Sequence, residues 1–280
     1  MSYRQFCVPP VRLFRFRVER MRRPAQKTAR GDLRPRRLDS RRAGAQNALL
    51  AGIPDREYGI IESNLEPFEF AQQAILYEPP APLAFAYFPN RGLISLVVGT
   101  EDGKTVEAGM AGPEGVAGVA AAVGLTLSTL RYVVHIPGDG VRIKVGTLAD
   151  SLKSTPHFQT ALFRYAVVQG MQIAQTAACN RLHDVRERMA RWLLMAADRV
   201  NSTSLPITHD FLANAVGTLR PSVSLAAEIL QRKKLIRYCR GSIEILNRQK
   251  LEQSACECYR VVRQFNGLLQ LPNRHSPILG

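Results

Sequence analysis

The chain has 280 residues, 46% of them hydrophobic, which is enough for one large domain or two ordinary domains with a true core. The net charge of +15 favours a polyanionic partner, most simply nucleic acid. Five cysteines do not make a disulfide framework in a chain of this length, and the sequence shows neither a membrane-spanning apolar run nor a secretion signal. We therefore expect a cytoplasmic protein without a membrane partner.

Basic residues concentrate at the two ends of the chain. The net charge is +11 over residues 1–46, −4 over residues 47–180 and +8 over residues 181–280. Residues 1–46 are rich in Arg and Pro, and such a segment buries too little apolar surface to fold, so we expect a disordered basic extension. Two interpretations of it stay open: an arm that embraces DNA, and an inert extension that begins at an upstream translation start.

A β-domain is predicted over residues 47–150. Asn47 begins a short helical segment that Gly52 and Pro54 close. Short apolar runs separated by turn signals then predict strands at residues 74–77, 84–88, 93–98, 106–110, 131–136 and 141–145. Asp102-Gly103, between two of these runs, is the strongest hairpin signal in the set. Many short strands at close spacing indicate a β-sandwich or barrel.

Residues 151–200 are expected to be a dimerisation helix region. From Phe158 to Asn201 the chain contains no Pro and one Gly. A coiled-coil seam with spacings of three and four is formed by Val168, Met171, Gln175, Ala178, Leu182, Val185 and Met189. A helix of this length exceeds what one small domain can bury, so we expect it to pair with its copy in a homodimer. Packing on the β-domain is the alternative explanation for part of the seam.

Residues 208–232 have the pattern of two helices joined by a tight turn. Thr208 is a suitable N-cap for the first helix, and Gly217 stands where the turn needs a positive φ. Pro221 suits the first position of the second helix, where its missing N–H costs nothing. The residues expected to face inward are Phe211, Leu212, Ala213, Val216, Val223, Ala227 and Leu230.

The start of the second helix is left facing outward, and in this kind of motif that end enters the major groove of DNA. The predicted DNA contacts are Thr208, Thr218, Leu219, Arg220, Ser222, Ser224, Leu225 and Arg240. Arg220 is the principal candidate because a guanidinium reads guanine in bidentate fashion, at about 1–3 kcal/mol of discrimination. Ser222 and Ser224 suit phosphates or base edges at close approach.

A β-hairpin after the second helix is expected to form a wing. It comprises residues 236–238, a Cys239-Arg240-Gly241 turn and residues 243–246, and the basic run Arg232-Lys233-Lys234 precedes it. Helix, turn, helix and wing in this order, with basic charge beside them, favour double-stranded DNA as the partner over a plain helical hairpin. We therefore predict a winged helix-turn-helix domain at residues 201–265 and a flexible tail at residues 266–280.

These residues resemble the Crp/Fnr family, the cyclic-AMP-receptor-like regulators, over about residues 47–265. Stretches typical of a proteobacterial subgroup are Tyr87-Phe-Pro-Asn-Arg-Gly92, Gly112-Pro-Glu-Gly115, Cys179-Asn-Arg181, Arg188-Met-Ala-Arg-Trp-Leu-Leu194 and Cys256-Glu-Cys-Tyr259. The resemblance implies an α+β fold: an N-terminal cyclic-nucleotide-binding-like β-roll (jelly roll), a long dimerisation helix and a C-terminal winged helix-turn-helix. It also implies a homodimer on a pseudo-palindromic operator, with RNA polymerase as a further partner and an unidentified small-molecule effector.

The family's effector contacts are only partly present. In its cyclic-AMP binders an Arg-Ser pair holds the cyclic phosphate, and that pair falls on Ser128-Thr129, where the Arg is absent. The Thr-Ser pair that touches the purine falls on Ile173-Ala174, which lack hydroxyls. Glu114 matches the carboxylate that takes the ribose hydroxyl, although its glycine-rich surroundings are also those of a turn. We expect no cyclic-AMP binding, with Glu114, Ser128 and Thr129 as the remaining effector candidates.

No cofactor or metal is predicted. Cys7 stands alone before Cys179, so the N-terminal cysteine cluster of the family's iron–sulfur members is absent. Cys256 and Cys258 form a Cys-x-Cys pair, which is a weak metal signal without a further Cys or His nearby. We interpret Cys179, Cys256 and Cys258 as packing residues, and a redox switch through Cys179 is the alternative.

Enzyme chemistry has no support in the sequence, which shows no phosphate-binding glycine loop, nucleophile elbow, zinc-binding helix motif or paired carboxylates above chance. His135 and His157 are conceivable haem ligands, but a lone His is more often an ordinary hydrogen-bonded residue. We predict a sequence-specific DNA-binding transcription regulator. The alternative is a small-ligand sensor module that signals through protein contacts, and it leaves the second helix and the wing unexplained. The best-known members carry Glu and Arg where this chain has Pro221 and Leu225, so its operator should differ from theirs.

Overall fold

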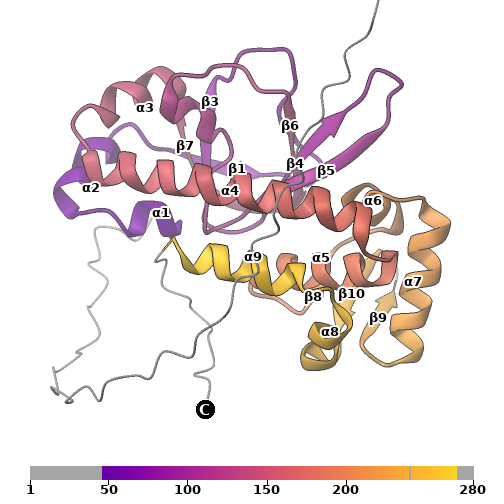
Figure 1. The fold of residues 1–280 in the computed structure, drawn as a ribbon. Helices are drawn as coiled ribbons and strands as arrows, with labels where there is room; N and C mark the ends of the chain where they lie inside the picture. The colour runs from indigo at the N-terminus through magenta and orange to yellow at the C-terminus, as the bar shows by residue number, and fades with distance from the viewer. Residues whose placement is uncertain (1–45, 240, 270–280) are drawn as a thin grey trace, which may run out of the picture. The chain divides into compact units, whose positions relative to one another are not determined.

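Two short helices begin the part of the chain that the structure describes. The structure is a computed structural model, and it describes residues 46–239 and 241–269 (Figure 1). α1 (Ala48–Ala51) is capped by Asn47, whose side chain accepts a hydrogen bond from the Leu49 N–H, and α2 (Asp55–Glu62) follows. The predicted short helix is thus confirmed, whereas α2 was not expected. Most of the predicted basic extension and tail, and Arg240 of the wing, lie outside the described residues.

The next part of the chain is a β-roll of two antiparallel sheets. Its strands are β1 (Glu66–Phe70), β2 (Ile75–Tyr77), β3 (Phe85–Pro89), β4 (Leu93–Gly99), β5 (Thr105–Ala111), β6 (Leu130–Ile136) and β7 (Gly138–Lys144). The strand orders are β1-β7-β3 and β2-β6-β4-β5. All six predicted strands are present, and Gly103 turns the β4–β5 hairpin at a φ of 79°. Only β1 was missed, because Glu66 and Glu69 interrupt its apolar residues.

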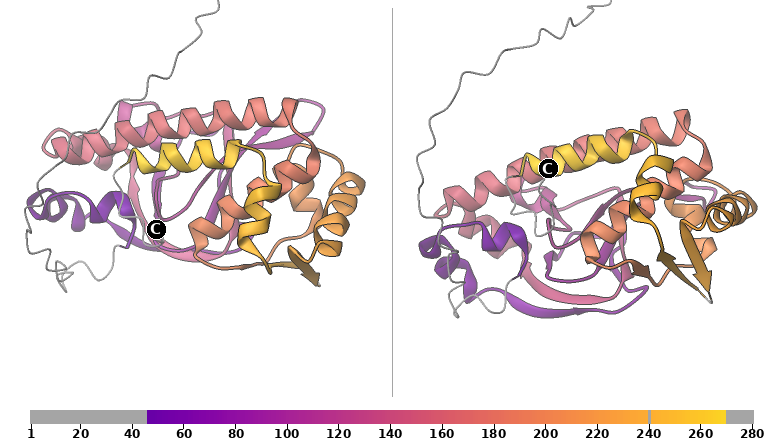
Figure 2. Two further views of the ribbon diagram at one scale, coloured as in Figure 1. Left: turned by 60° about the horizontal axis from the view of Figure 1, so that its bottom comes forward. Right: turned by 90° about the horizontal axis from the view of Figure 1, so that it is seen from below.

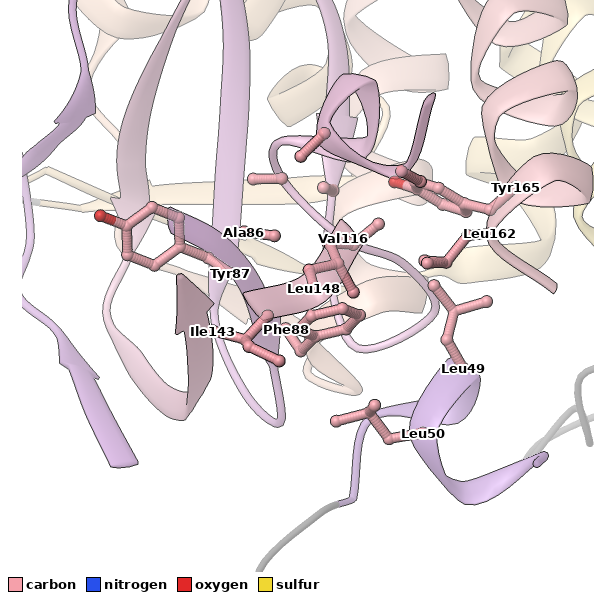
Figure 3. Close-up of a cluster of buried hydrophobic side chains, with 14 of the residues drawn as sticks. Leu49, Leu50, Ala86, Tyr87, Phe88, Val116, Ile143, Leu148, Leu162 and Tyr165 are labelled. Atoms are coloured by element: carbon pink, nitrogen blue, oxygen red, sulfur yellow. The ribbon is translucent and has the colours of Figure 1, made fainter. Parts of the chain in front are cut away.

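A first hydrophobic core packs strands of the β-roll against neighbouring helices (Figure 3). It draws side chains from α1, β3, β7, α3 (Val145–Leu152) and α4 (Pro156–Leu182), with the 3₁₀ helix η2 (Val119–Val123) beside them. The residues labelled in the figure are Leu49, Leu50, Ala86, Tyr87, Phe88, Val116, Ile143, Leu148, Leu162 and Tyr165. Phe88 and Phe158 also pack ring against ring, with centroids 6.0 Å apart, so α4 is fixed against β3.

The long helical region is broken into two helices, α4 and α5 (Val185–Val200). The single helix predicted from Phe158 to Asn201 is therefore wrong. Asp184 begins α5 with a capping box, in which its side chain accepts from the Glu187 N–H and the Glu187 side chain accepts from the Asp184 N–H. A capping box is a helix-start signal, and here it starts a new helix inside a stretch without Pro.

α4 divides its residues between the chain's own core and solvent. Phe158, Leu162, Tyr165 and Val168 are buried in the first core. The apolar side chains exposed on the opposite face are Phe163, Val167, Met171 and Leu182. The predicted seam is therefore partly wrong: Met171, Ala178 and Leu182 are exposed, Gln175 is half-buried, Val168 faces inward, and Val185 and Met189 belong to α5. At this point of the helix Val167, and not the predicted Val168, is exposed on the outward face.

The C-terminal part contains the predicted helix-turn-helix and wing. Its elements are β8 (Ser204–Leu205), α6 (His209–Ala215), α7 (Arg220–Arg232), β9 (Ile236–Cys239), β10 (Ser242–Ile245), α8 (Arg248–Ser254) and α9 (Cys258–Gly267). The wing is confirmed as the antiparallel β9–β10 pair, to which β8 adds a third strand. α9 runs alongside α4 (Figure 2). The expected fold class, a β-roll, a long helix and a C-terminal winged helix-turn-helix, is confirmed, and among the described residues no helix could cross a membrane.

A second core joins the β-roll to α5 and the helix-turn-helix. At its centre the indole N–H of Trp192 donates to Glu107 Oε1 at 2.7 Å, and the Ser95 hydroxyl donates to Glu107 Oε2 at 2.5 Å. Burial raises the pKa of Glu107 to about 7, against the hydrogen bonds from Ser95 and Trp192, which lower it. His135 of β6 packs against Phe211 of α6. Burial lowers the pKa of His135 to about 3.

Glu107→Gln should flatten the pH dependence of stability. The unfolded chain ionises Glu107 from a pKa near 4.5, whereas the folded chain keeps the proton up to about pH 7. The free energy of unfolding is therefore highest below about pH 4.5 with respect to this group, and it falls as the pH rises to about 7. Glutamine keeps an acceptor for the Trp192 N–H and carries no charge. Over this pH range the free energy of unfolding of the variant should therefore fall by on the order of 1–3 kcal/mol less than that of wild type.

Urea unfolding of both proteins between about pH 5 and pH 8 measures this difference. His135 acts in the opposite sense, since its lowered pKa reduces stability as the pH falls from 6.5 towards 3. That contribution is common to both proteins and cancels in the comparison. If the free energy of unfolding changed equally with pH in wild type and Glu107→Gln, Glu107 would be ionised in the folded chain over the whole of this pH range.

Candidate nucleic-acid interface

α6 begins where the sequence places an N-cap. The hydroxyl of Thr208 accepts a hydrogen bond from the Phe211 N–H at 3.2 Å, which satisfies one of the donors that a helix start leaves open. Leu212, Ala213 and Val216 are buried, as expected for the inward face. Phe211 is half-buried and packs edge-on against Trp192, with ring centroids 5.2 Å apart, so the second core sets the position of α6.

The turn between α6 and α7 depends on Gly217. Its φ of 61° lies in the left-handed region that favours glycine. A Cβ at this position would also stand 3.3 Å from Asn180 Nδ2 and 3.3 Å from Val106 Cγ2, so the turn packs closely on α4 and β5. Any other residue at position 217 would therefore meet both an unfavourable φ and close neighbours on α4 and β5.

α7 presents its first turn to solvent. Arg220 is its first residue and Pro221 stands within that first turn, while Val223, Ala227 and Leu230 are buried on the opposite face. This burial fixes which side of the helix is free. The outward side is the one on which the sequence places the DNA-reading residues.

The exposed start of α7 carries the cation Arg220, with an apolar residue before it at the N-cap and another in the second turn. Leu219 and Leu225 are 74% and 57% exposed, so both are accessible to a partner. The Arg220 guanidinium lies 3.3 Å from the Asp210 carboxylate, and both side chains are more than 60% exposed. Thr218 and Ser222 are half-buried beside them. The predicted contacts of this turn are therefore on one accessible surface.

His209 is a residue whose role the sequence analysis missed. Its Nδ1 lies 3.1 Å from the Ser224 hydroxyl, and its ring stacks on Tyr238 with centroids 4.1 Å apart. Burial, followed by the nearby Arg220, lowers the pKa of His209, so a neutral ring is favoured. His209 thus joins α6, α7 and the wing, and the predicted contact Ser224 is half-buried with its hydroxyl beside this ring. Nothing in the local sequence marks the contact, because its partners are 15 and 29 positions away.

The basic residues near the wing are partly neutralised by neighbouring carboxylates. Arg237 pairs with Glu244 across the β9–β10 hairpin, and Arg232 lies 3.6 Å from Glu228 on α7. Lys233 and Lys234 are exposed between α7 and β9. Arg240, predicted to contact DNA, lies outside the described residues.

Two of the three remaining effector candidates, Glu114 and Ser128, contact neighbours within the chain. The Arg199 guanidinium donates to Glu114 Oε1 at 2.7 Å and to Gln172 Oε1 at 3.0 Å, and both charged side chains are largely buried. The Ser128 backbone exchanges hydrogen bonds with the Tyr77 hydroxyl, and Thr129 is exposed. Glu114 thus already holds a buried cation, and no pattern in the sequence pointed to Arg199 as its partner.

The histidine and cysteine residues considered as metal or haem ligands have neighbours within the chain. His157 Nδ1 lies 2.6 Å from Glu57 Oε1, which also accepts a hydrogen bond from the His157 N–H. Desolvation acts to raise the pKa of Glu57, but hydrogen bonds from the Phe158 and His157 backbone and from the His157 ring outweigh it and lower the pKa. Cys179, Cys256 and Cys258 are buried together, as their interpretation as packing residues requires. The same three thiols lie beside His183, which the sequence analysis did not connect with them.

The comparisons with known proteins agree with this arrangement. A family model described as the Crp-like helix-turn-helix domain matches residues 187–254, from α5 through α8. Comparison with curated protein sequences found no match. The resemblance to the Crp/Fnr regulators is therefore confirmed by the domain that carries the candidate interface, and by the fold described next.

Solved structures share the fold over about two thirds of the chain. TTHB099, a CRP-family transcriptional regulator from Thermus thermophilus, is 21% identical, with 67% of this chain and 96% of that chain covered and a TM-score of 0.56. FixK2 from Bradyrhizobium japonicum is 16% identical, with 69% and 98% covered and a TM-score of 0.60. The c-di-GMP-responsive global regulator CLP from Xanthomonas campestris is 14% identical, with 69% and 99% covered and a TM-score of 0.58.

Proposed function

We propose that this chain, which has the fold and the helix-turn-helix domain of the Crp/Fnr regulators, is a transcription regulator that binds an operator as a homodimer. The exposed first turn of α7 carries the proposal. Its buried face is held by the second core, its start is set by Gly217, and Arg220 stands at its tip. A helix presented in this way fits the major groove of B-DNA, with its N-terminal residues toward the base edges.

Arg220 is proposed as the base-reading residue, supported by the remaining contacts of the interface. Its pairing with Asp210 is an exposed ion pair, which is worth about 0–1 kcal/mol and is readily exchanged for a guanine edge. Thr208, Thr218, Ser222 and Ser224 are proposed to approach phosphates or base edges, and Leu219 and Leu225 to contact thymine methyl groups. RNA polymerase is the partner expected of such a regulator once it is bound.

Arg220→Ala should weaken binding to an operator selected from random duplex DNA by about 5- to 150-fold, which corresponds to the loss of one bidentate contact. The affinity for unrelated duplexes should change much less. Fluorescence anisotropy at fixed salt measures both affinities. Arg131→Ala is the matched control, because Arg131 is also an exposed, ion-paired arginine but lies on β6, where it pairs with Glu78 at 2.7 Å. An unchanged affinity of Arg220→Ala for the selected operator would refute the assignment.

The homodimer is proposed to form through the outward stripe on α4. Phe163, Val167, Met171 and Leu182 are 39–72% exposed, and small residues lie among them, including Ala174 and Ala178. They follow each other at spacings of three and four, so they share one side of the helix. The opposite side of α4 is already buried in the first core, so this stripe is left for a second copy of the chain.

Met171→Glu and Leu182→Glu should each convert the dimer to a monomer at micromolar concentration, because they bury a charge in an apolar seam. Sedimentation equilibrium measures the association constant. Leu125→Glu is the matched control, since Leu125 is 59% exposed but lies outside α4. The proposal fails if wild type is a monomer, or if both charged variants dimerise as wild type does.

The β-roll is proposed to respond to something other than cyclic AMP. Ser128-Thr129 offers no cation for a cyclic phosphate, and Ile173 and Ala174 offer no hydroxyl for a purine. Glu114, the one matching carboxylate, is bound to Arg199. The c-di-GMP-responsive regulator of the same fold supports the view that this fold does not fix its ligand.

Cyclic AMP at millimolar concentration should therefore leave the melting temperature unchanged. A ligand present at about 100 times its Kd would add about 2.7 kcal/mol and raise the melting temperature by several degrees. Differential scanning fluorimetry with a cyclic AMP titration makes the measurement, with AMP as the control for non-specific effects. A saturable shift with micromolar affinity would overturn the assignment of these positions.

A further inference from the structure

Two distant segments bring four metal-binding side chains together. Cys179 and His183 stand one turn apart at the C-terminal end of α4, and Cys256 and Cys258 flank the start of α9. One ligand atom of each lies within 4.8 Å of the others. The three cysteines are buried and His183 is half-buried. The thiols form a cluster of their own and belong to neither large hydrophobic core.

Two of the spacings among these atoms are close to the edges of a tetrahedral site. Cys179 Sγ and Cys256 Sγ are 3.5 Å apart, and Cys258 Sγ is 3.6 Å from His183 Nδ1. With Zn–S bonds of about 2.3 Å and Zn–N bonds of about 2.0–2.1 Å, the edges of a tetrahedron are about 3.8 Å between sulfurs and about 3.6 Å from sulfur to nitrogen. Both measured pairs therefore match a site for a single ion, and all four ligand atoms lie within 4.8 Å of one another.

His183 and Cys258 make hydrogen bonds of the kind that support metal ligands in proteins. His183 turns Nδ1 towards the thiols, and its Nε2 lies 3.2 Å from Glu257 Oε1, so the carboxylate favours the tautomer that leaves Nδ1 free. Gln175 Nε2 lies 3.0 Å from Cys258 Sγ and donates to it, which suits a sulfur that carries negative charge. Simple packing of small apolar residues would not need either contact.

We propose that Cys179, His183, Cys256 and Cys258 form a Zn²⁺ site. Three thiolates and one imidazole are a structural zinc donor set, and four protein ligands leave no open position for catalysis. The proposal does not depend on DNA binding. The site ties the end of α4 to the start of α9 and lies at the break between α4 and α5, where the β-roll and its helix meet the helix-turn-helix domain.

The first experiment measures metal in the full-length protein. Protein purified under reducing conditions, without added chelator, should contain about one zinc per chain by mass spectrometry of the metal. After removal with a chelator, Co²⁺ should restore the site. It should give the intense visible absorption of tetrahedral cobalt and a near-ultraviolet sulfur-to-cobalt charge-transfer band. Metal binding should also release protons, since thiols must ionise to bind.

The second experiment uses variants of the four ligands and of their neighbours. Cys258→Ser should lose the charge-transfer intensity of one thiolate and bind zinc more weakly, whereas Cys239→Ser, an exposed cysteine on β9, should behave as wild type. Glu257→Gln removes only the carboxylate behind His183 and leaves the fold intact. It should weaken zinc binding by about 10- to 100-fold in a competition with a chromophoric chelator.

Three results would overturn the proposal. The first is fully reduced, folded protein that binds neither zinc nor Co²⁺ stoichiometrically. The second is an unchanged zinc affinity in both Cys258→Ser and Glu257→Gln. The third is a Cys179–Cys256 disulfide, or a coloured species containing iron and sulfide, as the state of the purified protein.

Discussion

The indole N–H of Trp192 donates to Glu107 across the joint between the β-roll and α5, beside the apolar core on which the helix-turn-helix packs. Both groups are buried, and either one left without its partner would cost about 1–3 kcal/mol, so β5 and α5 must meet in one register. Apolar side chains from the sheet, including Leu93 and Met110, share a core with the helices that follow. Phe211 packs on Trp192, and the placement of α6, and through it of α7, follows from the same joint.

The first turn of α7 is exposed because its neighbours occupy the other sides of the helix. The buried face packs on the second core, and the His209 ring contacts Ser224 of α7 and stacks on Tyr238 of the wing. Among the described residues, Arg220 at the tip forms an exposed ion pair with Asp210, whereas Arg199 is held in the interior by Glu114 and Gln172. Interior pairs of that kind are costly to open, and exposed pairs are not. The Arg220 guanidinium is therefore free to change partners at the proposed DNA interface, whereas the Arg199 guanidinium is held in place in the interior.

Local chemistry let the sequence predict most elements. Alternating apolar residues and Asp102-Gly103 indicated the strands of the β-roll, and Thr208, Gly217 and Pro221 indicated the helix-turn-helix, because caps, positive φ and missing N–H groups act within a few residues. The local features missed were α2, β1 and the capping box at Asp184, and the other misses concern contacts between distant positions. Glu114 meets Arg199 after 85 residues and Cys179 meets Cys256 after 77, and no periodicity records such pairs. The seam on α4 was misplaced at Val168 because both faces of that helix are apolar, so the spacing alone could not tell which one the β-roll covers.

The corner between α4 and α5 connects these features. A continuous helix would carry α5 away from the sheet, and Trp192 could not then reach Glu107. Breaking the helix exposes the last carbonyls of α4, and the chain satisfies them locally: the His183 N–H donates to the Cys179 carbonyl, and Arg188 reaches back to the Asn180 carbonyl at 3.0 Å. The residues that close the corner are thus next to those that gather the thiols around His183. One short segment therefore ends the exposed stripe of α4, starts the helix that carries Trp192 and holds the start of α9.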